Sequence, residues 1–330
     1  MSLQTSETEE LTVREAIRDT LHEEMGADER VFVQGIDVAG RGGTFGVLEG
    51  LTEEYGEERV RNTPISEVAI VGSGLGAAMT GMRPVVEVMY SGFLGVPMDQ
   101  LLNQVAKLRY MTNGNVDIPL TIRTQNTSGF RAAAQHSQAL HQVLMAIPGI
   151  KVACLSTPAD AKGLLRSAIR HDDPVIVFEH AGVYNRSGEA PVGEHEIPIG
   201  EAAVEREGTD VTVVATQVQL WNALEAAEEL AEEGIDVEVV SPRTFDPLDV
   251  DTIADSVRKT GRCVVADDTP LRAGTQSELA ALVHEECFFD LDFPVQRIGV
   301  ENVPIPFSPT LEDEVVPGTE DHIAAIRRLA

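Results

Sequence analysis

The sequence of 330 residues contains only four lysines and three cysteines, and it has no run of eighteen apolar residues. The missing hydrophobic run excludes a membrane-spanning helix, and the acidic, polar start MSLQTSETEE predicts that no secretory signal is present. Cys154, Cys263 and Cys287 are far apart, odd in number and without C-x-x-C spacing. They predict buried thiols in a reducing cytoplasm.

Basic residues are also scarce. The sequence contains 25 of them and 54 acidic residues, which gives a net charge of −29. Such a balance disfavours nucleic acid as a partner, because a polyanion is repelled by a strongly acidic surface. The acidic residues are spread over predicted helix faces, as in Glu225, Glu228, Glu229, Glu232 and Glu233. A surface of this kind repels itself in dilute buffer and is screened at high ionic strength, so we infer a salt-rich, halophilic cytoplasm.

Short apolar runs alternate with helical patterns along most of the chain. This alternation predicts an α/β fold with parallel sheets covered on both faces. The polar stretch 186–200 contains proline and glycine and interrupts the pattern, which predicts a first domain over 1–190, a linker over 191–200 and a smaller α/β domain over 201–330. The expected strands are Val31–Val33, Pro84–Met89, Leu120–Arg123, Val152–Leu155, Val175–Phe178, Val211–Ala215, Val237–Val240, Cys263–Ala266 and Val295–Val300.

The segment Thr63-Pro64-Ile65-Ser66-Glu67 places a carboxylate before a glycine-rich run. Gly72 to Ala77 match G-x-G-x-x-A after apolar residues, with Glu87 further on, which imitates a dinucleotide-binding fingerprint. However, Ser66 is a plausible N-cap, so the helix is expected to begin at Glu67 and to hold the glycines as small packing residues. The alternative for Glu67 is a purely structural role, in which its carboxylate in the first turn interacts with the helix dipole.

The whole chain resembles the beta subunit of the thiamine diphosphate-dependent first component of 2-oxo acid dehydrogenase complexes, the group that includes pyruvate, branched-chain and acetoin dehydrogenases. The resemblance implies a pyrimidine-binding domain followed by a transketolase C-terminal domain. The ordered anchors that carry it include Gly35-Ile36-Asp37-Val38, Thr63-Pro64-Ile65-Ser66-Glu67, Gly81-Met82-Arg83-Pro84, Ala106-Lys107-Leu108-Arg109-Tyr110, Gln135-His136-Ser137-Gln138, Pro242-Arg243-Thr244 and Leu311-Glu312-Asp313.

The same resemblance implies specific roles. Glu67 would bond the pyrimidine ring nitrogen of the cofactor, Ile65 would line that pocket, and Phe93 would lie against the pyrimidine, although a lone Phe is by default a core residue. His136 matches the family's active-site histidine, which assists reductive acylation of the lipoyl group; the alternative is a satisfied polar residue at a helix start.

A further loop resembles one that holds a monovalent cation, such as K⁺, mainly through backbone carbonyls. The residues concerned are Leu120, Ala168, Ile169, His171 and Asp173. His171 and Asp173 replace the usual Asp and Asn of relatives. Ile36 is a second departure, because relatives commonly carry an acidic residue there that points toward the active site.

One motif of thiamine enzymes is missing, because no Gly-Asp-Gly occurs in the sequence. The resemblance therefore implies that an alpha subunit holds the diphosphate and its Mg²⁺ in an alpha2-beta2 heterotetramer. The expected reaction is cleavage of a 2-oxo acid or acetoin, followed by acyl transfer to lipoamide on a lipoyl-bearing acyltransferase. The alternatives are a nicotinamide-dependent oxidoreductase built on Gly72–Ala77 and a non-catalytic subunit that completes an oligomer.

Overall fold

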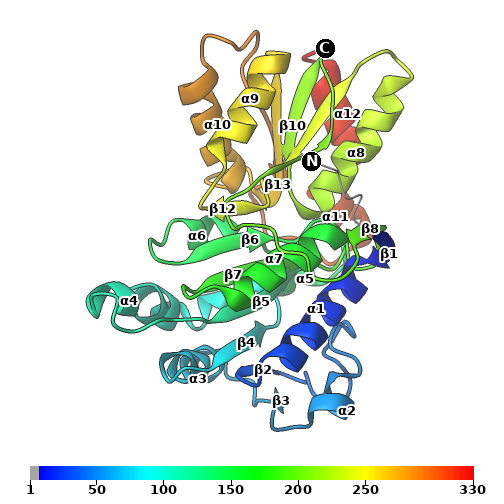
Figure 1. Ribbon diagram of the computed structural model, residues 1–330. Helices are drawn as coiled ribbons and strands as arrows, with labels where there is room; N and C mark the ends of the chain where they lie inside the picture. The colour runs from blue at the N-terminus through cyan, green and yellow to red at the C-terminus, as the bar shows by residue number, and fades with distance from the viewer. Residues whose placement is uncertain (1–6) are drawn as a thin grey trace. The chain divides into compact units, whose positions relative to one another are not determined.

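The computed structural model describes residues 7–330, which form two compact units (Figure 1). Unit 1 extends to Gln125 and resumes over Ile147–Ile199, and unit 2 consists of Asn126–Ala146 and Gly200–Ala330. The segment 126–146 therefore interrupts unit 1 in sequence but belongs to unit 2 in space. Within the described residues, no helix is long and apolar enough to cross a membrane.

Unit 1 is built on a parallel sheet with the strand order β6-β7-β5-β4-β2-β3. Helix α1 packs against α7, and α3 packs against β4. A separate antiparallel pair joins β1 to β8. The elements are β1 (Thr8–Thr12), α1 (Val13–Ala27), β2 (Val31–Gly35), α2 (Leu51–Tyr55), β3 (Val60–Asn62), α3 (Glu67–Met79), β4 (Arg83–Val88), the turn η1 (Ser91–Gly95), the π-helical segment η2 (Gln100–Val105), α4 (Leu108–Met111), β5 (Thr121–Asn126), β6 (Lys151–Cys154), α7 (Pro158–Arg170), β7 (Val175–His180) and β8 (Ser187–Pro191).

Unit 2 is built on a sheet with the order β14-β13-β10-β11-β9, in which β9 is antiparallel and the other strands are parallel. The apolar faces of α8 and α12 form one core with this sheet. The elements are α5 (Ala133–Ser137), α6 (His141–Met145), β9 (Ala203–Arg206), β10 (Val211–Ala215), α8 (Gln217–Ala231), β11 (Val237–Ser241), β12 (Thr244–Asp246), α9 (Val250–Thr260), β13 (Cys263–Pro270), α10 (Thr275–Cys287), β14 (Gln296–Val300), α11 (Pro309–Asp313) and α12 (Thr319–Arg327).

The expected strands are present with end shifts of a few residues, because buried runs of branched residues in a parallel sheet are distinctive. One segment differs from its expectation. Part of the polar stretch 186–200 forms β8, since its backbone pairs with β1 along the full length of both strands. The three cysteines are buried and form no disulfide among residues 7–330, which confirms the prediction of buried thiols.

Candidate functional site

Glu67 is the first residue of α3 and lies at the carboxyl edge of the sheet in unit 1. The amide of Thr63 donates to the carbonyl of Gly35 at 2.8 Å, which holds the turn before α3 against the end of β2. The expected helix start is confirmed, with Ser66 at the N-cap position. Glu67 is only 8% exposed, and within residues 7–330 its carboxylate has no hydrogen-bond or ion-pair partner. A nearly buried carboxylate in that state is suited to accept a bond from a ligand.

The glycines that imitate a dinucleotide fingerprint lie inside α3. A side chain at Gly74 would place its Cβ 2.6 Å from Cγ1 of Val86, so this glycine allows close packing of α3 on β4. Glu87, the acid expected to meet a ribose in the nicotinamide alternative, is buried against Arg123 instead. The segment therefore has no glycine turn facing a pyrophosphate, and the geometry does not favour the nicotinamide alternative.

Ile65 and Phe93 lie in the same unit as Glu67. Ile65 is 81% exposed, which is unusual for an isoleucine. Phe93 is half-buried in η1, where its neighbour Leu94 fills the core, and its ring meets that of Tyr90 edge to face at 6.1 Å. Glu67 follows β3 and Phe93 follows β4, and both strands neighbour β2. Parallel α/β sheets bind ligands at this carboxyl edge.

His136 lies in unit 2, in the short helix α5, and is half-buried. Its backbone carbonyl accepts a hydrogen bond from Oγ1 of Thr127 at 2.5 Å. The neighbouring Gln135 and Gln138 line a pocket of about 420 Å³ that also reaches Asp268. Unit 2 thus offers open space directly beside the helix that carries His136.

A buried polar network in unit 2 was not predicted from the sequence. Nδ2 of Asn126 lies 2.7 Å from Nε2 of His141, and Nδ1 of His141 lies 3.4 Å from Oδ2 of Asp267. Burial by itself raises the pKa of Asp267, but His141 and the hydroxyls of Thr275 and Thr216 outweigh it and hold that pKa below its ordinary value. The network ties the segment 126–146 to β13.

A second unpredicted cluster lies in the core of unit 1. Arg123 binds Glu179 in a bidentate manner at 2.6 and 2.9 Å and reaches Glu87 at 3.1 Å. The hydroxyl of Tyr184 donates to Glu179 at 2.6 Å. Burial raises the pKa of Glu87 more strongly than Arg123 lowers it. Each contact joins residues of different strands or loops, so no local sequence pattern predicts the cluster.

The residues expected to bind a monovalent cation gather at the end of α7. The carbonyls of Ile169 and His171 both accept hydrogen bonds from Nη1 of Arg83, at 3.0 and 3.2 Å. The carbonyl of Leu120 accepts from the amide of Val175, which is a sheet contact, and that of Ala168 accepts from the amide of His171. The carbonyl end of a helix favours a cation, and here the guanidinium already provides one.

Side-chain groups surround these carbonyls. Oδ1 of Asp173 accepts from Arg109 at 2.7 Å, and Lys151 approaches its other oxygen at 3.8 Å. Burial and the charge of Lys151 lower the pKa of His171, whose Nδ1 accepts from the amide of Asp173. Among the residues described, no group of three or more His, Cys, Asp or Glu side chains is arranged to hold a metal ion.

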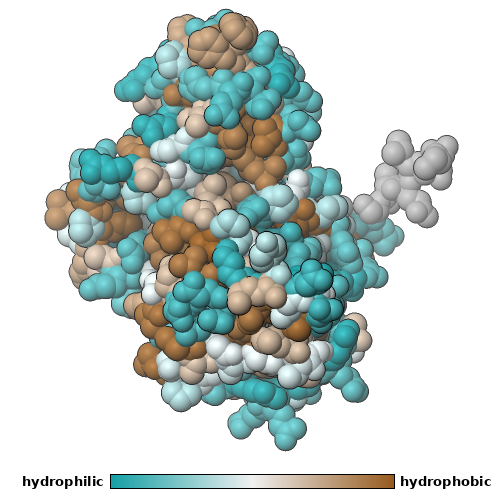
Figure 2. Space-filling view, turned by 90° about the vertical axis from the view of Figure 1, so that its left-hand side faces the viewer, coloured by the Kyte–Doolittle hydropathy of each residue, from teal (hydrophilic) through white to brown (hydrophobic). Residues whose placement is uncertain are grey.

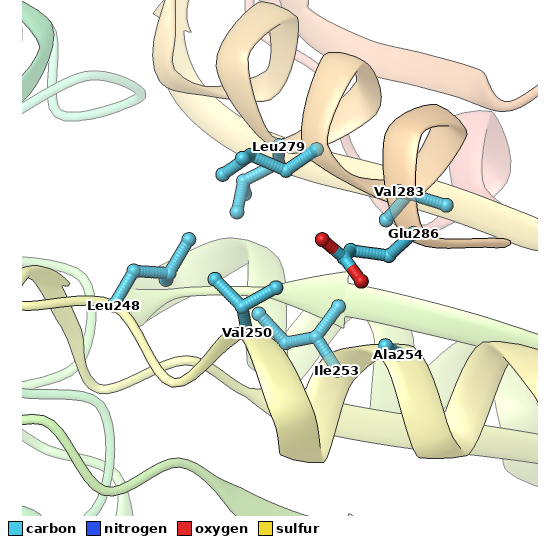
Figure 3. A pocket seen from close by; sticks show the side chains of 8 residues that line it. Leu248, Val250, Ile253, Ala254, Leu279, Val283 and Glu286 are labelled. Atoms are coloured by element: carbon cyan, nitrogen blue, oxygen red, sulfur yellow. The ribbon is translucent and has the colours of Figure 1, made fainter.

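An apolar slot in unit 2 lies between α9 and α10 (Figure 3). Leu248, Val250 and Ile253 face Leu279 and Val283 across the gap, with Glu286 at its edge. Only one titratable side chain lines the slot, so it has the character of a packing gap between two helices. It carries no set of groups that could perform catalysis.

Comparison with protein families gives two matches that together cover most of the chain. Residues 9–186 match the transketolase pyrimidine-binding domain, and residues 200–322 match the transketolase C-terminal domain. The solved structure of a split-gene transketolase, an inactive beta4 tetramer, has a TM-score of 0.76 over 97% of this chain and 98% of its own, at 23% identity. At that identity the likeness shows the fold alone.

Three curated relatives are similar to this chain over nearly their whole length. The acetoin:2,6-dichlorophenolindophenol oxidoreductase subunit beta of Bacillus subtilis is 44% identical, over 96% of both chains. The 2-oxoisovalerate dehydrogenase subunit beta of Bacillus subtilis is 41% identical, over 96% of this chain and 97% of its own. The pyruvate dehydrogenase E1 component subunit beta of Rickettsia felis is 40% identical, over 97% and 98%.

Proposed function

The chain belongs to the transketolase-like family that includes the beta subunits of acetoin, 2-oxoisovalerate and pyruvate dehydrogenases, and we propose that it supplies the pyrimidine half of a thiamine diphosphate site. The reaction is cleavage of a 2-oxo acid or acetoin and transfer of the acyl group to lipoamide on a second component. The observation that carries this proposal is Glu67, a nearly buried carboxylate that has no partner within residues 7–330.

When bound, thiamine diphosphate supplies the carbanion-stabilising chemistry that side chains lack. Glu67, in the first turn of α3, would accept a hydrogen bond from the pyrimidine ring N–H and so favour the imino tautomer of the cofactor. The half-buried ring of Phe93 offers an apolar face to a flat heterocycle, and the exposed side chain of Ile65 is available to line the same pocket.

His136 acts in the later step, as a proton donor or acceptor during acyl transfer to lipoamide. Its support is the half-buried position in α5 and the pocket that begins at the adjacent Gln135 and Gln138. Replacing His136 with Ala should slow lipoamide-coupled turnover by about 10²- to 10⁴-fold. Turnover with the dye 2,6-dichlorophenolindophenol as electron acceptor should change much less. Equal losses in both assays would contradict the assignment.

An alpha subunit completes the site in an alpha2-beta2 heterotetramer and holds the diphosphate with its Mg²⁺, because this chain has no Gly-Asp-Gly. The exposed apolar residues of unit 1 support a partner, since Ile65, Tyr110 and Met111 are 81, 88 and 70% exposed. Figure 2 faces the side on which α4 lies in Figure 1 and shows several apolar areas there. The lipoyl-bearing acyltransferase is the second partner.

A monovalent cation such as K⁺ at Leu120, Ala168, Ile169, His171 and Asp173 is a minor part of the proposal. Its support is the set of carbonyls at the end of α7, and its competitor is the guanidinium of Arg83. If the ion binds, replacing KCl with choline chloride at equal ionic strength should lower the melting temperature of the complex. An unchanged melting temperature would leave Arg83 as the cation of this site.

Acetoin is the preferred substrate in this proposal. The stretches Pro64–Ile70 and Ala132–Gln138 resemble acetoin dehydrogenase beta subunits, and Ile36 removes an acidic group. We also propose that the linker 191–200 divides the two domains. We further propose a salt-rich cytoplasm, because the net charge of the chain is −29. The deciding measurement is kcat/KM of the reconstituted complex for acetoin, pyruvate and branched-chain 2-oxo acids. A tenfold preference for either oxo acid, about 1.4 kcal/mol in transition-state binding, would overturn acetoin.

The proposal as a whole is tested by thermal shift with thiamine diphosphate plus Mg²⁺ and, separately, with NADH. The chain is measured alone and after co-expression with an alpha subunit. The split site predicts a cofactor-dependent shift only for the alpha-beta complex, and no shift with NADH. Tight thiamine diphosphate binding by the isolated chain, or stabilisation by NADH, would contradict it.

A further inference from the structure

The turn before α5 is capped by a buried carboxylate from a distant part of the chain. Glu312 of α11 is fully buried in unit 2. Its Oε1 accepts from the amide of Gly129 at 2.9 Å, and its Oε2 accepts from the amide of Arg131 at 2.9 Å and from Nη1 of Arg131 at 2.8 Å. One side chain therefore satisfies two backbone donors that no helix or strand would otherwise pair.

The backbone of this turn requires such support. Gly129, Arg131 and Ala133 have φ angles of 79°, 58° and 63°. Two of the three carry a side chain, for which the left-handed region is unfavourable. The turn begins with a bond from the amide of Phe130 to the carbonyl of Thr127 at 3.1 Å. A strained turn persists only when its surroundings hold it, and Glu312 is the group that binds two of its amides.

The turn leads directly into α5, which carries His136. Ala133 is both the last left-handed residue of the turn and the first residue of the helix. Oγ1 of Thr127, where the turn begins, donates to the backbone carbonyl of His136. The two ends of the loop 127–136 are thus joined, so a change in the turn is transmitted to the position of His136.

We propose that Glu312 is a positioning residue for His136, and this inference rests on the proposed role of His136 in acyl transfer. Glu312 does not touch the reacting atoms. It fixes the conformation of the turn 127–133, and this turn then fixes the position and orientation of α5. Among the described residues, the exposed neighbour Asp313 binds only Nη2 of Arg131, at 2.5 Å, and has no hydrogen bond to a backbone amide of the turn. It offers a matched control on the same short helix.

The experiment compares Glu312→Gln, Asp313→Asn and His136→Ala in the reconstituted alpha-beta complex. Gln fills the space of Glu, but its NH₂ group then faces one of the two backbone amides that donate to the carboxylate in the wild type. Glu312→Asp is the second variant if Glu312→Gln fails to assemble, because Asp keeps two acceptor oxygens at a shorter reach. Two properties are measured: hydrogen exchange of peptides covering 127–138, and turnover with lipoamide and with 2,6-dichlorophenolindophenol.

We expect Glu312→Gln to speed exchange in 127–138 and to slow lipoamide-coupled turnover by about 10- to 100-fold, the cost of a displacement near 1 Å. Dye-coupled turnover should fall less than threefold, Asp313→Asn should resemble the wild type, and adding Glu312→Gln to His136→Ala should cause no further loss. Unchanged exchange, equal losses in both assays, or additive losses would overturn the inference. If His136→Ala is itself unselective, the proposed role of His136 fails, and exchange alone decides whether Glu312 holds the loop.

Discussion

His322 in α12 allows a quantitative prediction of how stability depends on pH. The residue is fully buried in unit 2, and its Nε2 lies 2.9 Å from Oε1 of Gln219. An amide oxygen only accepts, so Nε2 carries the proton and Nδ1 is bare. Within residues 7–330, Nδ1 has no hydrogen-bond partner. Charging the ring would bury a cation whose new N–H has no acceptor, and burial lowers the pKa of His322 to about 4 despite the nearby Asp268.

The sign of the effect follows from the two pKa values. The unfolded chain takes up a proton at His322 near its ordinary value of 6.5, whereas the folded chain does so only near 4. Stability that is fully present above pH 6.5 is therefore lost as the pH falls toward 4. The loss is about 3 kcal/mol, because folding lowers the pKa of His322 from 6.5 to about 4 and a tenfold change in a protonation equilibrium is worth about 1.36 kcal/mol.

Urea unfolding of the isolated chain in molar KCl measures this loss. The free energy of unfolding is determined between about pH 7.5 and pH 4 for the wild type, for His322→Gln and for a control, His284→Gln, at a half-buried position on α10. The difference between wild type and His322→Gln should shrink by about 3 kcal/mol as the pH falls, and the control shows what removal of a histidine from another helix of unit 2 does over the same pH range. A difference for His322→Gln that stays constant within about 0.5 kcal/mol would refute the reasoning.

Three further predictions concern packing, buried charge and salt. Gly74→Ala should lower the free energy of unfolding by about 1–3 kcal/mol, because the added Cβ contacts Val86. Gly76→Ala should raise the free energy of unfolding by about 0.5–1 kcal/mol, because its added Cβ meets no atom within 4 Å. Urea unfolding of the isolated chain measures both. The pKa of Glu87 is raised in the folded chain, so its ionisation lowers stability as the pH rises above the unfolded pKa of 4.5. The melting temperature of Glu87→Gln should therefore increase relative to that of the wild type as the pH rises. A difference in melting temperature that does not change with pH would contradict the raised pKa. The melting temperature should rise clearly from about 0.1 M to about 2 M KCl, and indifference to KCl would contradict the halophilic inference.

Local sequence signals were sufficient where the structure is set by neighbours in the chain. The helix begins at Glu67 as expected, with Ser66 at the N-cap position, although the Ser66 side chain forms no cap hydrogen bond. The buried strands follow from their apolar runs. The same signals explain why the glycines of α3 could be separated from a nucleotide-binding turn, because a helix that begins before them removes the turn.

The long-range polar contacts could not be predicted in this way. His141 and Asp267 are separated by 126 residues, and Glu312 and Gly129 by 183. Such pairs leave no periodic trace, since each depends on where two distant segments meet in the folded unit. For the same reason, no sequence pattern indicated that the segment 126–146, with His136, packs in unit 2.

The most direct test of the central claim replaces Glu67 with Gln in the alpha-beta complex and follows exchange of the thiazolium proton of bound thiamine diphosphate. Glu53→Gln is the control, because Glu53 is an exposed first-turn carboxylate of α2. The account predicts normal assembly, a fall in kcat of about 100-fold or more and slowed proton exchange for Glu67→Gln, with wild-type behaviour for the control. Wild-type exchange in the Glu67→Gln complex would contradict the account.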